Sequence, residues 1–257
     1  MTILKKLLLG AASAAAVMTA VPAFADDAPA APAWGLSGTI DVQSDYKFRG
    51  ISQNDRSPSP QGTLNLTGPA GFYAGTWLST IDFDPTPSGN PYLEMDIYGG
   101  KHTDLWGVDW NLEAYYYGYP AANIPPGTSR PDYFEMINQF TKAFGPVTAQ
   151  VTWAWSPSFA FRTGPSHYLA GNLSYPINDW LSISGNVGHQ FISRTPVYDY
   201  TYGDIGLTAT WKMFSLDVRY SGTDLNNTNC SAFYMSTNHA CAGDFIATLN
   251  YNFTLLP

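Results

Sequence analysis

Charged residues are scarce in this chain. Asp, Glu, Lys and Arg make up 12% of its 257 residues, whereas aromatic residues make up 15%. A soluble domain usually carries nearer a quarter of charged residues. Bases are the scarcer sign, with 12 Lys and Arg against 20 Asp and Glu. Because nucleic-acid backbones are bound by clustered cations, this balance argues against a nucleic-acid partner.

Long apolar runs are missing beyond the first 25 residues. Lys5 and Lys6 precede an Ala-rich apolar run, and Ala-Phe-Ala at 23–25 forms an A-x-A cleavage site. We interpret 1–25 as a cleaved secretory signal peptide and 26–33 as a flexible leader. The alternative is a transmembrane anchor, but the run is shorter than the ~20 residues that a spanning helix needs. The rest of the chain could cross a membrane only as a closed barrel.

Cysteine is nearly absent, with only Cys230 and Cys241. They lie close together in a segment rich in Asn, Ser and Thr, and an oxidising periplasm would let them form a disulfide. Two unrelated thiols are the alternative. A structural zinc ion needs four ligands and only His239 lies nearby, so we expect no metal site. The chain has no G-x-S-x-G and no phosphate-binding loop, and we expect no cofactor and no enzymatic activity.

What the chain does have is an apolar–polar alternation, clearest over 36–49. Successive side chains of a strand point to opposite faces. One parity is mostly apolar and ends in Tyr46 and Phe48, whereas the other is wholly polar. A strand divided in this way fits a sheet that separates hydrocarbon from water, as in an outer-membrane barrel.

The same pattern recurs along 34–257, where turn signals separate about twelve segments. An all-β fold is therefore predicted, a transmembrane antiparallel β-barrel of about twelve strands. In the third segment, Tyr73, Trp77, Ile81 and Phe83 share one parity. The predicted strands are 36–49, 61–67, 72–83, 92–101, 108–119, 133–144, 147–156, 167–175, 181–191, 200–211, 214–221 and 244–253.

The connections between these segments alternate in length. Outer-membrane barrels have short periplasmic turns and longer external loops, so we expect the long connections, rich in Pro, Asn, Ser or Thr, to lie outside. A soluble β-sandwich gives no reason for this alternation. The predicted short turns are 68–71, 102–107, 145–146, 176–180 and 212–213. The predicted external loops are 50–60, 84–91, 120–132, 157–166, 192–199 and 222–243.

Several motifs carry a family resemblance. The stretch SDYKFRGISQ at 44–53, QG at 61–62, GFYAGTW at 71–77 and EMDIYGG at 94–100 resemble the TorF-type porin family of bacterial outer-membrane proteins. The resemblance is strongest over 36–119 and continues more weakly to the C-terminus. It implies a barrel and, by the family's name, a pore, and it brings no catalytic residues. The two cysteines are not part of the family pattern.

We assign the polar parity of the strands to the lumen. Acids then outnumber bases in the predicted pore lining, and an acidic lumen attracts cations and repels anions. The alternative is that these charges pair and fill a closed interior. The hairpin at 212–213 places Asp204 diagonally opposite Arg219, so an ion pair is expected there. The predicted lining comprises the acids Asp41, Asp45, Glu94, Asp96, Asp109, Glu113, Glu135, Asp204 and Asp217, and the bases Lys47, Arg49 and Arg219.

The sequence thus favours a narrow passive channel of the bacterial outer membrane for small cationic or neutral solutes. Such a barrel is wider than those that side chains fill and narrower than general porins. Its expected partners are outer-membrane lipid, small solutes and the barrel-assembly machinery. One alternative is a plugged structural or adhesive barrel. The other is a lipid-modifying enzyme, for which His167 and His189 would face each other across the 176–180 hairpin.

Overall fold

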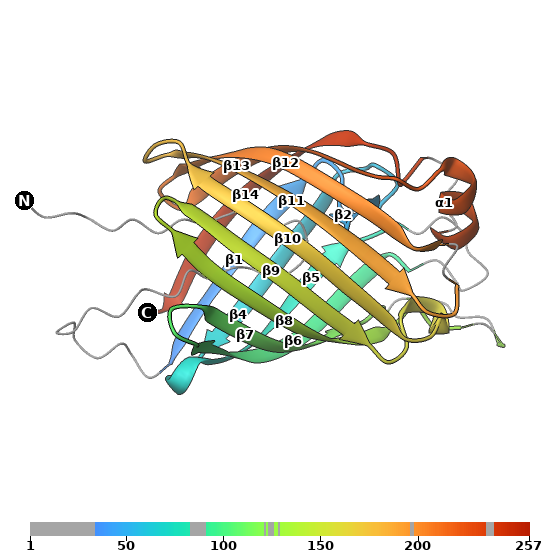
Figure 1. Cartoon of the computed structure of the whole chain (residues 1–257), viewed down its shortest axis with the longest axis horizontal. Helices are drawn as coiled ribbons and strands as arrows, with labels where there is room; N and C mark the ends of the chain where they lie inside the picture. The colour runs from blue at the N-terminus through green and yellow to red at the C-terminus, as the bar shows by residue number, and fades with distance from the viewer. Residues whose placement is uncertain are drawn as a thin grey trace, which may run out of the picture.

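The computed structural model describes residues 34–82, 91–120, 122, 126–127, 129–195, 198–234 and 239–257. Twelve long strands close into one barrel in the order β1-β14-β13-β12-β11-β10-β9-β8-β7-β6-β5-β4 (Figure 1). Neighbours along the chain pair antiparallel, and β1 closes the barrel against both β14 and β4. The predicted all-β barrel is confirmed, whereas the predicted signal peptide and leader lie outside the described residues.

The barrel strands run almost where the alternation placed them. The predicted bounds of β8, β9 and β12 agree with the structure at both ends. The wall comprises β1 Gly35–Gln43, β4 Ser59–Thr67, β5 Phe72–Thr80, β6 Leu93–Asp104, β7 Asp109–Tyr117, β8 Tyr133–Phe144, β9 Val147–Ser156, β10 Ser166–Pro176, β11 Leu181–Ile192, β12 Tyr200–Trp211, β13 Phe214–Thr223 and β14 Asp244–Leu256. The remaining elements are β2 Lys47–Phe48, β3 Ile51–Ser52, the helix α1 Asn227–Tyr234 and the short turns η1 Pro69–Gly71 and η2 Ala160–Arg162.

The wall is apolar outside and polar inside, as β13 illustrates. Its outward residues Leu216 and Val218 are 46% and 43% exposed, whereas its inward residues Asp217 and Arg219 are 1% and 6% exposed. Burying a charge inside while exposing aliphatic side chains outside reverses the arrangement of a soluble domain. Such a wall is stable where its outer surface meets hydrocarbon.

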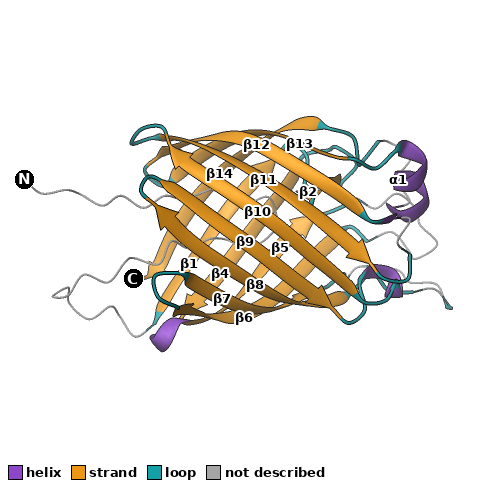
Figure 2. Cartoon of the chain, viewed as in Figure 1, coloured by secondary structure: helices purple, strands orange, loops and turns teal. Residues whose placement is uncertain are grey.

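The two ends of the barrel differ. Helix α1 and the longer connections lie at one end, which we call the loop end, and the tight turns and the C-terminus lie at the other, the turn end (Figure 2). The turns around Gly145 and Lys212 have positive φ at 63° and 54°, which lets two residues join neighbouring strands. Within the described part of the chain, no helix is long and apolar enough to cross a membrane.

Strand β5 is turned the other way from the prediction. Its parity with most of the aromatic residues faces the lumen instead of lipid. On β5, Phe72 and Leu78 are exposed on the outer surface, whereas Trp77 is buried inside the barrel. Ile81, directly after β5, is also buried. The interior at this level is itself lined with rings, so an inward tryptophan has apolar partners. Phe83, assigned to the same parity, lies outside the described residues.

The two faces of β11 give a direct test of the wall. Val187 is 58% exposed on the outer surface, and Val187→Arg would place a charge in lipid at a cost of roughly 2–4 kcal/mol near the midplane. Asn186 points inward opposite Asp204, so Asn186→Arg should gain a partner and fold normally. The heat-modifiable shift in gel mobility and urea unfolding from lipid vesicles measure the loss of folded protein and of stability in each variant. Equal losses for both variants would contradict the assignment of the faces.

Candidate functional site

The chain leaves the barrel wall after β1 and enters the lumen. We call residues 44–58, between β1 and β4, the insert. It contains a small hairpin in which Lys47 pairs with Ser52 and Phe48 with Ile51. The turn places Arg49 and Gly50 at φ of 48° and 84°. A Cβ on Gly50 would lie 2.7 Å from Cβ of Tyr202, so glycine is required by both the backbone and the close approach.

The insert packs against opposite parts of the wall. The Tyr46 ring lies 5.2 Å from that of Trp77, and the Phe48 ring lies 5.6 Å from that of Tyr117. Ile51 packs into a separate cluster that includes residues of β12. The prediction of one strand over 36–49 with Tyr46 and Phe48 facing lipid is therefore wrong. The prediction of an external loop over 50–60 is correct only in part, because Ile51 and Ser52 are buried inside the barrel, whereas Arg56 and Ser57 are exposed at the loop end.

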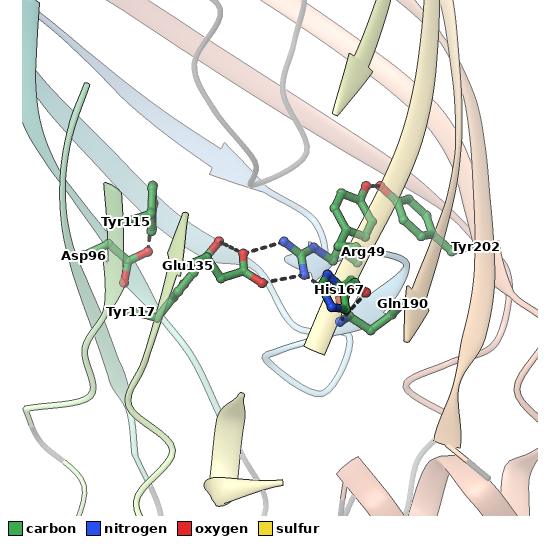
Figure 3. Close-up of polar contacts among 9 residues, drawn as sticks. Arg49, Asp96, Tyr115, Tyr117, Glu135, His167, Gln190 and Tyr202 are labelled. Atoms are coloured by element: carbon green, nitrogen blue, oxygen red, sulfur yellow. Dashed lines mark hydrogen bonds and ion pairs between the residues drawn. The ribbon is translucent and has the colours of Figure 1, made fainter. Parts of the chain in front are cut away.

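Arg49 ties the insert to three strands (Figure 3). Its Nη1 and Nη2 donate to Oε1 and Oε2 of Glu135 on β8, at 3.0 and 2.6 Å. Nη1 also donates to Oε1 of Gln190 on β11 at 2.5 Å. The guanidinium lies 3.8 Å from the centre of the Tyr168 ring on β10. A planar fork that meets a carboxylate at two points fixes orientation as well as charge, so Arg49 holds the insert in one position.

Tyrosine hydroxyls donate hydrogen bonds to the acids on the wall of β6 and β7. Tyr115 donates to Asp96 at 2.9 Å (Figure 3) and Tyr73 donates to Glu113 at 2.7 Å. Tyr119 donates to Oε1 of Glu94 at 3.2 Å. Among the described residues, no basic side chain forms a salt bridge with these three acids. These three acids therefore meet hydroxyl donors in place of a counter-charge.

The tyrosine rings form a continuous stack along the same wall. The rings of Tyr98 and Tyr115 are 5.1 Å apart, those of Tyr115 and Tyr117 are 4.5 Å apart, and those of Tyr117 and Tyr133 are 4.2 Å apart. Offset and edge contacts between aromatic rings favour one arrangement. The stack narrows the lumen on the side that faces the insert.

A second charged cluster lies between β12 and β13. Gly206 pairs with Arg219 across the hairpin, so Asp204 lies diagonally opposite Arg219, as predicted. Arg219 donates to Asp204 at 2.6 Å and to Asp217 at 2.6 Å, so the expected ion pair is confirmed. Thr208 also donates to Asp217 at 2.7 Å. These contacts fix a positive side chain to the wall between two acids.

The remaining predicted lining residues occupy different places. Asp41 points inward on β1 and is 7% exposed. Asp45 and Lys47 belong to the insert instead of the wall, and Asp45 accepts a hydrogen bond from Ser52 at 2.6 Å. Burial raises the pKa of the Asp45 carboxyl, while this hydrogen bond acts in the opposite direction. Asp109 lies at the turn end, where it contacts His102 at 2.9 Å.

Sequence reasoning missed Tyr168 and Gln190, the wall partners of Arg49. Both are inward residues of strands that were assigned correctly, but alternation alone cannot show which side chain crosses the lumen to meet them. The available signal was Gly50, because a glycine after a charged residue favours a turn with positive φ. A turn there would have ended the first strand.

Two further predictions concern side chains near the loop end. Cys230 and Cys241 form a disulfide, as expected. The prediction that His167 and His189 face each other is wrong. His167 pairs with Phe191, and His189 pairs with Leu169. The 176–180 turn shifts the register by two residues from the predicted one. Within the described ranges, no group of three or more His, Cys, Asp or Glu could hold a metal ion.

Comparison with solved structures places the fold among porins. The KdgM porin superposes with a TM-score of 0.53 at 7% identity, covering 85% of this chain and 99% of that chain. The NanC porin superposes with a TM-score of 0.53 at 9% identity, covering 86% and 100%. At such low identity, these similarities establish the fold alone.

The sequence itself matches one family over nearly its whole length. Residues 27–253 match the family described as "Bacterial protein of unknown function (Gcw_chp)". This match supports the bacterial origin that the motifs suggested and does not test the TorF name. The chain belongs to this family of bacterial proteins.

Proposed function

We propose that the protein is an outer-membrane channel for the passive passage of small cationic or neutral solutes, narrowed by the insert. The observation that carries the proposal is a closed barrel with an apolar outer wall and a polar, acid-rich lumen. Closure leaves no unpaired strand edge in lipid, and the polar interior gives water and solutes a path. The similarity of the fold to the two porins supports this reading.

The proposed setting follows from the same features. The outer surface meets outer-membrane lipid, and a chain of this kind reaches that membrane through its signal peptide and the barrel-assembly machinery. The long connections at the loop end face outside, and the tight turns face the periplasm. Small solutes are the partners of the lumen.

The preference for cations rests on how the lumenal charges are arranged. The two lumenal arginines have acidic partners, since Arg49 meets Glu135 and Arg219 meets two aspartates. Glu94, Asp96 and Glu113 meet hydroxyls instead. Where these acids are ionised, the field left over in the lumen is negative, and a negative lumen concentrates cations.

Reversal potentials in a salt gradient test the proposed selectivity. The wild type should pass cations in preference to anions, and replacing Glu94 by Gln and Asp96 by Asn together should lower the permeability ratio. The preference should also shrink at 1 M salt, where the Debye length is about 3 Å instead of about 10 Å at 0.1 M. Asp109→Asn is the control, because Asp109 lies at the turn end with a side chain that is 41% exposed, and should change the ratio less. An anion preference in the wild type would contradict the proposal.

The second candidate is a structural barrel whose lumen is shut. The observation that favours it is the near-complete burial of Tyr46, Glu135 and Gln190, which leaves little space beside the insert. This candidate predicts that the wild type and a variant lacking the insert differ in conductance, with steps in the variant alone. The enzymatic alternative loses its candidate site, because His167 and His189 are not paired.

A further inference from the structure

The disulfide lies beside the insert. Cys230 follows the first turn of α1, at the loop end of the barrel, and Cys241 lies just before β14 (Figure 1). Both cysteines are buried in one cluster with Ile51 of the insert and Ala240. We call Cys230, Ala240, Cys241 and Ala242 the disulfide anchor. Its position beside the open end of the insert hairpin, where Lys47 pairs with Ser52, suggests a role beyond joining two parts of a loop.

Hydrogen bonds connect the insert to the anchor on both sides of Cys241. The backbone N–H of Ser52 donates to the carbonyl of Ala240 at 2.9 Å. The Nζ of Lys47 donates to the carbonyl of Ala242 at 2.6 Å and to that of Ser221 at 3.2 Å. The two strands of the insert hairpin thus each bond to a neighbour of Cys241.

The anchor is fixed in turn to the barrel wall. The carbonyl of Cys241 accepts hydrogen bonds from the backbone N–H and the hydroxyl of Thr223, the last residue of β13, at 3.3 and 3.0 Å. Asp224 donates its N–H to Thr201 on β12 at 3.0 Å. The disulfide therefore holds residues 240–242 between the wall and the insert. Without it, 224–243 becomes one uncrosslinked connection, and ordering its end costs more entropy.

We propose that the disulfide anchor is a latch that keeps the insert in the lumen, so that opening the Cys230–Cys241 bond loosens the insert and widens the passage. A dithiol reductant would open it by supplying two electrons and two protons. One of its sulfurs forms a mixed disulfide, its second sulfur closes a ring, and both cysteines leave as thiols. The loosening depends only on the contacts above, and the widening rests on the proposed channel function.

Hydrogen–deuterium exchange of the folded, detergent-solubilised full chain tests the latch directly. In the Cys230→Ser/Cys241→Ser double variant, amides of 46–53 should exchange at least about ten-fold faster than in the oxidised wild type, because Ser52 loses an ordered acceptor. Wild type reduced by a dithiol should behave like the variant. Peptides from β9 and β10 are the internal control and should be unchanged. Equal protection of 46–53 in all three forms would overturn the proposal.

A second pair of variants tests the latch with the disulfide intact. Lys47→Met keeps the aliphatic stem and removes the donors to Ala242 and Ser221, so it should also speed exchange in 46–53. Lys212→Met at an exposed turn is the matched control and should have no effect. Protection of 46–53 that is the same in Lys47→Met as in wild type would count against the latch.

Planar-bilayer recordings of the same proteins separate the two proposals. A loosened insert with higher conductance supports both the latch and the channel. A loosened insert in a barrel that never conducts supports the latch and rejects the channel. An unchanged insert rejects the latch, whatever the conductance of the wild type.

Discussion

Replacing residues 45–57 with a Gly-Ser-Gly-Ser linker should raise single-channel conductance several-fold. The wall does not need these residues, because Gln43 of β1 pairs directly with Ser59 of β4, and neighbouring antiparallel strands are readily joined by a short hairpin loop. The replacement removes the rings of Tyr46 and Phe48 and the Arg49 side chain from the lumen. Recordings in planar bilayers at fixed salt measure the change.

The control for this variant keeps the insert and alters only its exposed end. Arg56 and Ser57 are exposed, and Arg56 has a φ of 59° that glycine adopts readily. Replacing both by Gly should leave the conductance near that of the wild type. A folded barrel without the insert that conducts no better than the wild type would show that the insert does not limit passage.

Glu135→Gln should lower the free energy of unfolding by about 3–5 kcal/mol, because it leaves the buried Arg49 guanidinium without its counter-charge. Glu135 is fully buried and also accepts a hydrogen bond from Tyr117 at 3.1 Å. Urea unfolding from lipid vesicles, followed by tryptophan fluorescence, measures the loss.

The matched control is the ion pair between Arg56 and Asp244 at the surface of the loop end. The two side chains are 34% and 44% exposed. Surface pairs contribute little, so Asp244→Asn should cost less than about 1 kcal/mol. If Glu135→Gln and Asp244→Asn lower the free energy of unfolding by the same small amount, Arg49 is not held by a desolvated ion pair. The insert is then less firmly fixed than its contacts imply.

The sequence was sufficient to predict most of the wall, apart from the inward face of β5 and the register between β10 and β11. On β13, apolar and polar residues alternate from Phe214 to Ser221, and only one assignment puts Asp217 and Arg219 away from lipid. The two-residue turn at 212–213 then set the register, which predicted the contact between Asp204 and Arg219. The faces of β13 and the register of its hairpin depend on residues that are close together in the sequence. The periodicity of apolar and polar residues was therefore enough to predict them.

The insert could not be predicted in this way. Its residues continue the alternation of β1 through Tyr46 and Phe48, and an aromatic side chain is as stable against other rings inside a barrel as against lipid. Whether Tyr46 and Phe48 lie inside the barrel or against lipid depends on Trp77 and Tyr117. These two residues lie on distant strands and meet the insert only in the folded chain. The inverted face of β5 has the same cause.

Single-channel recording of the purified wild-type protein in a planar bilayer with a salt gradient tests most directly whether the lumen conducts. A conducting lumen narrowed by the insert should give small, discrete conductance steps with a reversal potential of the sign for cation preference, and larger steps when the insert is replaced. No conductance steps from either protein, although both are folded and inserted, would contradict it.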